Sequence, residues 1–466
     1  MPATQSAPPV WSSRLTFYLA TVGAAVGLGS IWRLPYQVGA NGGSAFIFIF
    51  TLACLLIATP LLVAEFLLGR RSRLSPPDAA GAVARASGLT AWWNAIGVIG
   101  TIAIVVLASY YTVVAGWVLA YTWKCASGAL VGLQRPEVAR LWRAFLSNPL
   151  EVGAWHLAFL GLVALISARG VGRGIELATK VRAPVLLILL LILAAYAMAT
   201  GDVRTGLRFA FAPNVVAITP QVALAAIGQA FYATGVGLAM MLAYGAYVAR
   251  GTSLVRPALI ITGSILLVSL LATLTIFPLV FRYGMNPAQG PELVFDVLAS
   301  AFAEMPGGRL VGTLFFLLLV FAALTPSIAG LEPLVAWLQQ HRQVSRVRAA
   351  AVTAAMVWAL GLGSMLSFNY LSAWHPLGRL PMFADKTFFD VMDFLSSNVL
   401  PPVGAVLTSV LVGWRLSRTI VDEELLDTTP FAARVCVWLL RYVCPIAIAA
   451  VLASASYGTL AGSVSE

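Results

Sequence analysis

Among the ionisable residues inside apolar segments that are long enough to cross a membrane, three are notable: Arg33, Glu65 and Asp393. Charged groups are costly in hydrocarbon, and those found there usually pair with one another or handle a substrate or an ion. With a cytoplasmic N-terminus, Arg33 and Asp393 both fall toward the outer side of the membrane. They are therefore predicted to form an ion pair that opens and closes with a ligand. A static packing pair is the alternative.

Two glycine-rich interruptions accompany these charges. Gly23, Gly27 and Gly29 crowd the centre of the apolar segment 14–35, and residues 234–239 interrupt a later segment in a similar way. A helix in lipid must satisfy its backbone groups internally, so a break is tolerated only where the freed groups face protein or a water-filled cavity. Paired breaks in corresponding positions of two halves indicate a transporter's substrate site. Two small-residue faces for close helix packing are the alternative.

No motif of catalysis or metal binding accompanies the breaks. The histidines His156, His341 and His375 are scattered, without the spacing of metal ligands. The sequences Gly-x-Ser-x-Gly and His-Glu-x-x-His are absent. The chain is therefore not predicted to be an enzyme, and its four cysteines imply no disulfide framework.

The composition is that of a polytopic membrane protein. The chain has 466 residues, of which 60% are hydrophobic and 10% charged, whereas soluble domains have about 25% charged residues. The net charge of +11 comes largely from arginines in alternate loops between apolar spans, which is the positive-inside pattern and not a nucleic-acid surface. This pattern places the N-terminus in the cytoplasm and, with an odd number of spans, the C-terminus outside.

Eleven apolar segments have about the length of a transmembrane helix. They lie near residues 14–37, 42–69, 91–123, 153–168, 175–199, 219–248, 255–283, 311–338, 349–368, 388–414 and 432–456. The interruptions fall in spans 1 and 6, so a single domain over 1–466 is predicted to contain two repeats of opposite orientation. These repeats are 14–199 (spans 1–5) and 219–414 (spans 6–10), and span 11 (432–456) follows them.

The connection 284–308 combines proline, glycine and acidic residues with an apolar stripe at helical spacing. This pattern predicts a short re-entrant or lid helix. An amphipathic surface helix without a gating role is the alternative.

These residues resemble the neurotransmitter:sodium symporter family, in particular its eleven-span bacterial branch. The resemblance covers nearly the whole chain. Its strongest match runs from Trp11-x-x-Arg14 through Trp32-Arg33-Leu34-Pro35 to Asn41-Gly42-Gly43-x-Ala45-Phe46. Further matches include Pro60-Leu61-x-x-x-Glu65, Tyr110-Tyr111, Gly228-Gln229-Ala230-Phe231-Tyr232 and Phe321-Ala322-Ala323-Leu324-Thr325. It implies an all-α, 5+5 inverted-repeat fold whose spans 1 and 6 are unwound at mid-membrane. It also implies a cargo of amino acids or amines driven by sodium.

The resemblance assigns the substrate site by position. Its residues are Ala25, Gly29, Tyr111, Phe231, Tyr232, Gly235, Pro326 and Gly330. The Tyr111 hydroxyl would hold a carboxylate, and Tyr232 would cover the substrate beneath the gate formed with Arg33 and Asp393. Gly27 stands where the family's amine transporters carry an aspartate, which favours an amino acid as cargo. Because Gly235 and Gly330 remove bulk from the wall, a medium to large apolar or aromatic amino acid is expected.

The sodium sites depart from the family pattern. The second site would use Gly23, Val26, Ala322 and Thr325, but Pro326 replaces its second hydroxyl residue. The first site would use Ala25, Ser30 and Ala233, and span 7 offers it either Ile265 or, after a one-residue shift, Ser264. Chloride is not expected because Phe50 occupies the position of a tyrosine. The inner gate is also altered, because Gln340 replaces an aspartate and no Arg or Lys precedes Trp11.

The expected function is secondary active transport of amino acids across the inner or plasma membrane by alternating access. Sodium symport through weakened sites is the first hypothesis, and a carrier that is sodium-independent or proton-coupled is the second. An amino-acid sensor that binds without transport is a third, whereas a channel lacks any repeated filter or ring of charges. The expected partners are the substrate and the lipid bilayer, without nucleic acid, and the chain is expected to be a monomer or homodimer.

Overall fold

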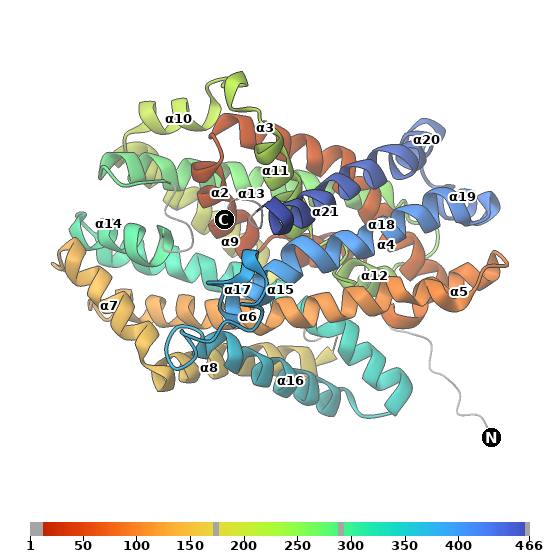
Figure 1. The fold of residues 1–466 in the computed structure, drawn as a ribbon, viewed down its shortest axis with the longest axis horizontal. Coiled ribbons are helices and arrows are strands. Elements are labelled where there is room, and N and C mark those ends of the chain that lie inside the picture. Colours follow the sequence, from red (N-terminus) through yellow and green to blue (C-terminus); the bar gives the residue numbers. More distant parts are fainter. Residues whose placement is uncertain (1–12, 171–176, 288–292, 462–466) are drawn as a thin grey trace.

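Long helices that pack side by side form the molecule. The computed structural model describes residues 13–170, 177–287 and 293–461, and these ranges contain helices, turns and coil without any strand. Two of the longest helices, α6 (Ala95–Ala126) and α15 (Gly308–Arg342), pack along each other at the centre. In Figure 1, α8 (Pro149–Ala168) and α16 (Arg346–Leu366) run beside α6 along one side of the molecule.

Nine helical segments of the described residues are long and apolar enough to cross a membrane. They are Ser44–Ser72, Ala91–Ala126, Pro149–Ala168, Arg182–Thr200, Val255–Arg282, Gly308–Arg342, Arg346–Leu366, Phe388–Arg415 and Pro430–Ser454. The bent pair Leu15–Ala25 and Gly29–Ala40 makes a tenth if it is one span. The predicted sixth span is interrupted, so the number eleven stays a prediction.

The first predicted break lies within the first helix. α1 (Arg14–Ala25) ends where Val26 takes an extended conformation, and the chain resumes as η1 (Gly29–Arg33) and α2 (Leu34–Ala40). The two parts are bent by 50°. The helix therefore breaks where the glycines predicted it, and its freed backbone groups lie inside the protein.

The second break separates α11 (Pro220–Thr234) from α12 (Met240–Gly245). Gly235 and Gly237 have φ values of +69° and +80°, in the left-handed region that glycine enters without steric cost. A Cβ atom on Gly237 would lie 2.3 Å from the Pro401 carbonyl oxygen. The buried Glu65 carboxylate accepts a hydrogen bond from the Gly237 amide at 2.7 Å. The intramembrane acid found in the sequence thus holds the broken segment.

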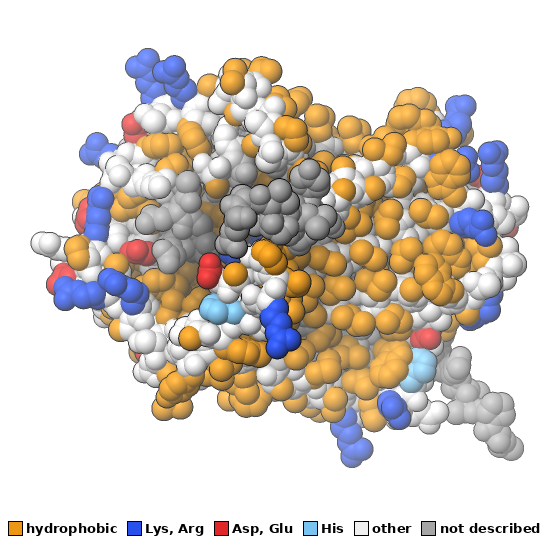
Figure 2. Space-filling model, in the orientation of Figure 1, with side chains coloured by type: hydrophobic (Ala, Val, Ile, Leu, Met, Phe, Trp, Pro, Cys, Tyr) orange, Lys and Arg blue, Asp and Glu red, His pale blue; other side chains and the backbone are white. Residues whose placement is uncertain are grey.

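The outer shell of helices includes α3 (Ser44–Ala53), α9 (Leu177–Thr200), α13 (Val255–Arg282) and the last helices, α20 (Pro430–Trp438) and α21 (Cys444–Ala461). Large apolar side chains such as Phe48, Ile188 and Leu267 are exposed there. In Figure 2, hydrophobic side chains cover the middle of the visible face, while most lysine and arginine side chains gather at its two ends. Such a belt fits a lipid-facing surface.

The predicted short helix at 284–308 is confirmed as η6 (Leu293–Leu298) and α14 (Ala299–Glu304), while residues 288–292 lie outside the described ranges. Val294, Val297, Leu298 and Phe302 of its apolar stripe are buried. Phe295 stacks on Trp142 of α7 (Arg135–Ser147) with the ring centroids 4.8 Å apart. A lid function for this segment stays a prediction.

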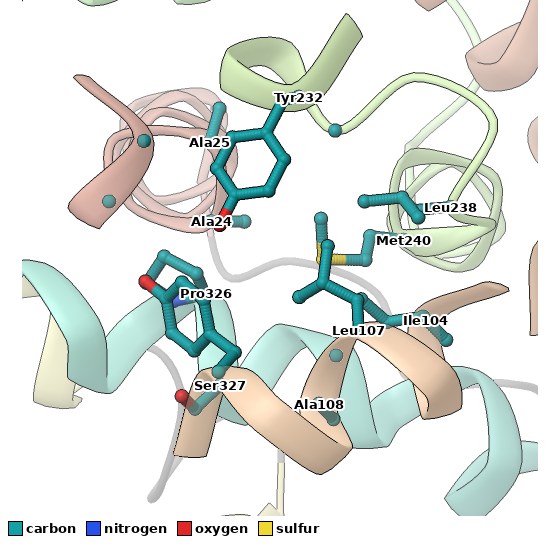
Figure 3. Close-up of a pocket in the computed structure, with 15 residues that line it drawn as sticks. Ala24, Ala25, Ile104, Leu107, Ala108, Tyr232, Leu238, Met240, Pro326 and Ser327 are labelled. Atoms are coloured by element: carbon teal, nitrogen blue, oxygen red, sulfur yellow. The ribbon is translucent and has the colours of Figure 1, made fainter. Parts of the chain in front are cut away.

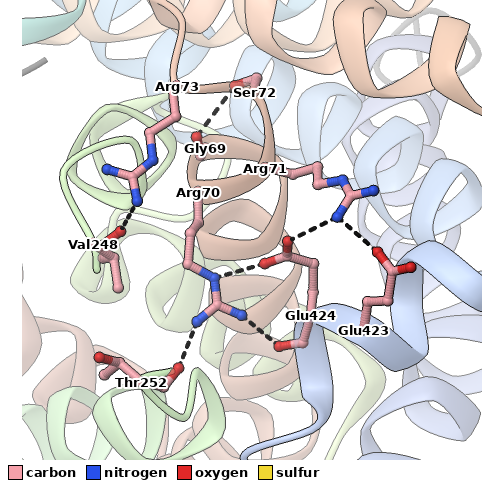
Figure 4. Close-up of polar contacts among 9 residues, drawn as sticks. All are labelled: Gly69, Arg70, Arg71, Ser72, Arg73, Val248, Thr252, Glu423 and Glu424. Atoms are coloured by element: carbon pink, nitrogen blue, oxygen red, sulfur yellow. Dashed lines mark hydrogen bonds and ion pairs between the residues drawn. The ribbon is translucent and has the colours of Figure 1, made fainter. Parts of the chain in front are cut away.

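Polar contacts join distant segments at the predicted cytoplasmic end. Arg70 lies in the last turn of α4 (Thr59–Ser72), and its guanidinium donates to the Glu424 carboxylate at 2.6 Å and to the Thr252 carbonyl at 2.5 Å. Arg71 pairs with Glu423 at 2.8 Å, and Figure 4 shows how both glutamates approach from α19 (Arg418–Leu425). This network joins α4 to α19 and to the segment after α12.

Candidate functional site

A pocket lies where the two broken helices meet α6 and α15. Its lining residues come from all four elements: Ala24, Ala25, Gly27, Gly29, Ile104, Leu107, Ala108, Tyr111, Tyr232, Gly235, Leu238, Met240, Pro326, Ser327 and Gly330. Figure 3 shows Tyr232 facing the pocket from one side and the apolar side chains of Ile104, Leu107, Leu238 and Met240 gathered on another. The pocket therefore combines an apolar wall with a few polar groups.

Seven of the eight predicted substrate residues line this pocket. They are Ala25, Gly29, Tyr111, Tyr232, Gly235, Pro326 and Gly330. Phe231 is not among the lining residues: its side chain is buried, and its carbonyl accepts a hydrogen bond from the Gly235 amide at 3.0 Å. Phe231 thus takes part in ending α11.

The Tyr111 hydroxyl lies at the break of the first helix. It accepts a hydrogen bond from the Leu28 amide at 3.3 Å, and a Cβ atom on Gly27 would lie 3.0 Å from it. The chain resumes as a helix immediately after this point, and the N-terminal end of a helix attracts negative charge. A hydroxyl beside such an end can bind a carboxylate.

The predicted gate residues meet above the pocket. The Arg33 guanidinium lies 3.3 Å from the Asp393 carboxylate and 4.0 Å from the centroid of the Tyr232 ring. Tyr110 donates to the Asp393 carboxylate at 2.8 Å, and Arg33 donates to the Ser397 hydroxyl at 2.8 Å. The Arg33 side chain is 12% exposed and that of Asp393 35%, so water screens this pair in part.

The predicted first sodium site has few side-chain oxygens. The Ser30 hydroxyl is buried and has no hydrogen-bond partner among the described residues. Ala25 and Ala233 offer only carbonyl groups. On α13, Ile265 is fully buried and Ser264 only partly so. The orphaned Ser30 hydroxyl fits a hard cation, whereas the buried Ile265 adds no oxygen to a cage that needs several.

A cation from the chain itself contacts one carbonyl of the predicted second sodium site. The Arg182 guanidinium on α9 donates to the Gly23 carbonyl at 3.1 Å and to the Phe321 carbonyl, next to Ala322, at 2.5 Å. The Thr325 hydroxyl is buried without a partner among the described residues. Pro326 lines the substrate pocket. Sequence analysis missed Arg182, although an arginine within the apolar run 175–199 was a signal.

The inner gate also differs from the sequence expectation. Trp11 lies outside the described residues, and the Gln340 side chain accepts a hydrogen bond from the Ser75 amide at 2.9 Å. Nearby in the chain, the fully buried Glu332 accepts hydrogen bonds from Arg346 at 2.6 and 3.0 Å and from the Tyr247 hydroxyl at 2.9 Å. Sequence analysis missed this cluster because its charges lie near the ends of predicted spans.

Comparisons with known proteins agree on one family. A model described as the sodium:neurotransmitter symporter family matches residues 9–133 and 147–452. An uncharacterized sodium-dependent transporter of Bacillus subtilis, YhdH, is 36% identical over 448 residues, with 96% of this chain and 97% of that protein covered. The bovine sodium-dependent neutral amino acid transporter B(0)AT2 is 27% identical over 305 residues, with 59% and 41% covered.

A solved structure also matches nearly the whole chain. The crystal structure of MhsT in complex with L-phenylalanine gives a TM-score of 0.88 at 34% identity and covers 96% of this chain and 99% of that chain. This similarity confirms the predicted all-α transporter fold and leaves the number of spans open.

Proposed function

The chain belongs to the sodium:neurotransmitter symporter family, and from that premise we propose that it moves a medium to large apolar or aromatic amino acid by alternating access. The family consists of secondary transporters and not enzymes. The observation that carries the proposal is the pocket between the two broken helices, which seven predicted substrate residues line.

The chemistry of the pocket fits an amino acid. The Tyr111 hydroxyl and the helix that begins at Gly29 provide a place for the carboxylate. The opposite wall of Ile104, Leu107 and Met240 is apolar, so it favours an apolar side chain. MhsT binds L-phenylalanine in its crystal structure, and B(0)AT2 is named for neutral amino acids. Both relatives support this cargo.

Alternating access requires that each side of the pocket opens in turn. The pair of Arg33 and Asp393 closes one side, and outward opening would separate it. On the other side, the contacts of Arg70 with Glu424 and of Glu332 with Arg346 join helices that inward opening would part. We assign the first side to the exterior, with the N-terminus in the cytoplasm and the C-terminus outside.

The remaining assignments are also proposals. We propose two inverted repeats, 14–199 and 219–414, in the inner or plasma membrane, and a monomer or homodimer. We propose weakened sodium coupling, because the first site retains only the Ser30 hydroxyl among its side chains. A sodium-independent or proton-coupled carrier and a non-transporting sensor are the alternatives. Chloride is not proposed, because buried Phe50 offers it no donor.

The test is binding and uptake by the purified full-length protein. An amino-acid panel is titrated in sodium, potassium or choline, and the best ligand is offered to proteoliposomes. We expect L-phenylalanine, L-leucine or L-tryptophan to bind more tightly than glycine, and uptake to follow binding. Tighter binding of glycine would contradict the proposed cargo. Tight binding without uptake would favour the sensor.

Gly330 is predicted to set the size of the cargo. A Cβ atom there would lie 3.1 Å from Ile104 Cγ1, so Gly330→Val pushes bulk against the apolar wall. We expect the Kd for L-phenylalanine to rise at least about fivefold, and that for L-alanine to change less. Gly263→Val is the matched control, because no atom lies within 4 Å of its Cβ position. An equal rise of the Kd for L-phenylalanine and for L-alanine would argue against a size effect.

The gate pair is predicted to act as one unit. Asp393→Ala should slow L-phenylalanine uptake about fivefold, the equivalent of roughly 1 kcal/mol for a partly exposed pair. Adding Arg33→Ala should cost less than the product of the two single effects, because the second change removes a partner already lost. Uptake by both single variants and the double variant measures this. Fully multiplicative losses would show that the two residues act separately.

A further inference from the structure

Arg182 is a buried arginine that the transport mechanism above does not use. Its side chain lies on α9 and is only 3% exposed. One terminal nitrogen donates to the Gly23 carbonyl of α1 at 3.1 Å, and the other donates to the Phe321 carbonyl of α15 at 2.5 Å. The guanidinium therefore bridges α1 and α15 close to the break that ends α1.

No carboxylate balances this charge among the described residues. The ion pairs of that part of the chain do not include Arg182. Its hydrogen-bond partners are two neutral carbonyl groups, and Gly23 lies in the last turn of α1. The C-terminal end of a helix carries partial negative charge and stabilises a cation. The surroundings of Arg182 are thus those of a cation site built from carbonyl oxygens.

This site overlaps the predicted second sodium site. Gly23 is one of its four candidate ligands, and Phe321 immediately precedes another, Ala322. The Gly23 oxygen already accepts a hydrogen bond from Arg182, and a sodium ion on the same oxygen would lie next to a fixed positive charge. The replacement of a second hydroxyl by Pro326 removes a further ligand. The residues present therefore do not fit sodium at this place.

We propose that Arg182 is a built-in cation that takes the place of the second sodium ion between α1 and α15. The role of Arg182 in transport rests on the proposed function, whereas the test below measures only sodium binding and does not depend on transport. Arg182 would hold the two helices together as a bound ion would, and the cargo would move without a second sodium.

The test uses sodium alone as the probe. The melting temperature of the full-length protein is measured in sodium chloride and in choline chloride at equal ionic strength, for the wild type and for Arg182→Ala, each with and without Thr325→Ala. The decisive quantity is the part of the sodium response that Thr325→Ala abolishes. A ligand that binds only the folded protein raises Tm, here by about 2–3 °C at 100 times its Kd. Arg140→Ala, at an exposed arginine, is the control.

In the wild type and in Arg140→Ala, we expect no rise of Tm in sodium that Thr325→Ala abolishes. In Arg182→Ala we expect a clear rise of this kind, because the two carbonyl groups become free to bind sodium. Arg182→Lys retains a cation and should behave as the wild type does. A wild-type response that Thr325→Ala abolishes would overturn the proposal, and so would its absence in folded Arg182→Ala. If Arg182→Ala does not fold, the proposal is tested by comparing the sodium-dependent Tm shift of the wild type with that of Thr325→Ala alone. A protein that takes up no amino acid but shows the expected responses would contradict the proposed function alone.

Discussion

Tyr111→Phe should weaken amino-acid binding about 10- to 150-fold, the range for one hydrogen bond to a charged group. The change removes only the hydroxyl oxygen, and the ring stays buried in α6. The hydroxyl contacts the protein through the Leu28 amide at 3.3 Å, a long hydrogen bond. Its loss should therefore cost little stability, whereas a bound carboxylate would lose its neutral donor.

The measurement is the Kd for L-phenylalanine, with 2-phenylethylamine as a second ligand because it lacks the carboxylate. The substitution should penalise the amino acid and leave the amine nearly unaffected. Tyr121→Phe is the matched control: it lies on the same helix, is buried, and its hydroxyl has no partner among the described residues. A change of less than twofold for L-phenylalanine would refute the role of Tyr111 as the carboxylate ligand.

The broken helices were predictable because their cause is local. Glycine at positions 235 and 237 permits left-handed backbone, and the residue type alone predicts this conformational freedom. The pair of Arg33 and Asp393 was also predictable, because two intramembrane charges of opposite sign on the same side have few other partners. Residue type and position in a span were sufficient for both predictions.

Other features depend on tertiary contacts that no local pattern encodes. The sequence places Arg182 near the start of an apolar span, but only the packing of α9 against α1 and α15 brings it to the Gly23 carbonyl. Phe231 shows the same limit, since the rotation of α11 turns Tyr232 into the pocket and leaves Phe231 outside its lining. One residue of register separates these two neighbours.

Glu332→Ala should destabilise the protein by about 3–5 kcal/mol, because it leaves a partly buried arginine without its partner. The Glu332 side chain is fully buried and that of Arg346 is 17% exposed. Arg346 donates to both carboxylate oxygens, at 2.6 and 3.0 Å, and the Tyr247 hydroxyl donates at 2.9 Å. One side chain thus joins α15, α16 and the segment after α12, so its removal affects three elements.

The melting temperature of the purified protein measures this cost, with an expected fall of about 3–5 °C for a chain of this length. Arg140→Ala is the control, because its pair with Glu137 is exposed and 3.9 Å long, and such pairs contribute at most about 1 kcal/mol. The double variant Glu332→Leu/Arg346→Met should regain part of the loss, since an apolar pair leaves no buried charge. A double variant less stable than Glu332→Ala would mean that Arg346 stabilises the fold through other contacts, such as its 2.8 Å hydrogen bond to the Ser167 carbonyl, and not through this charge pair.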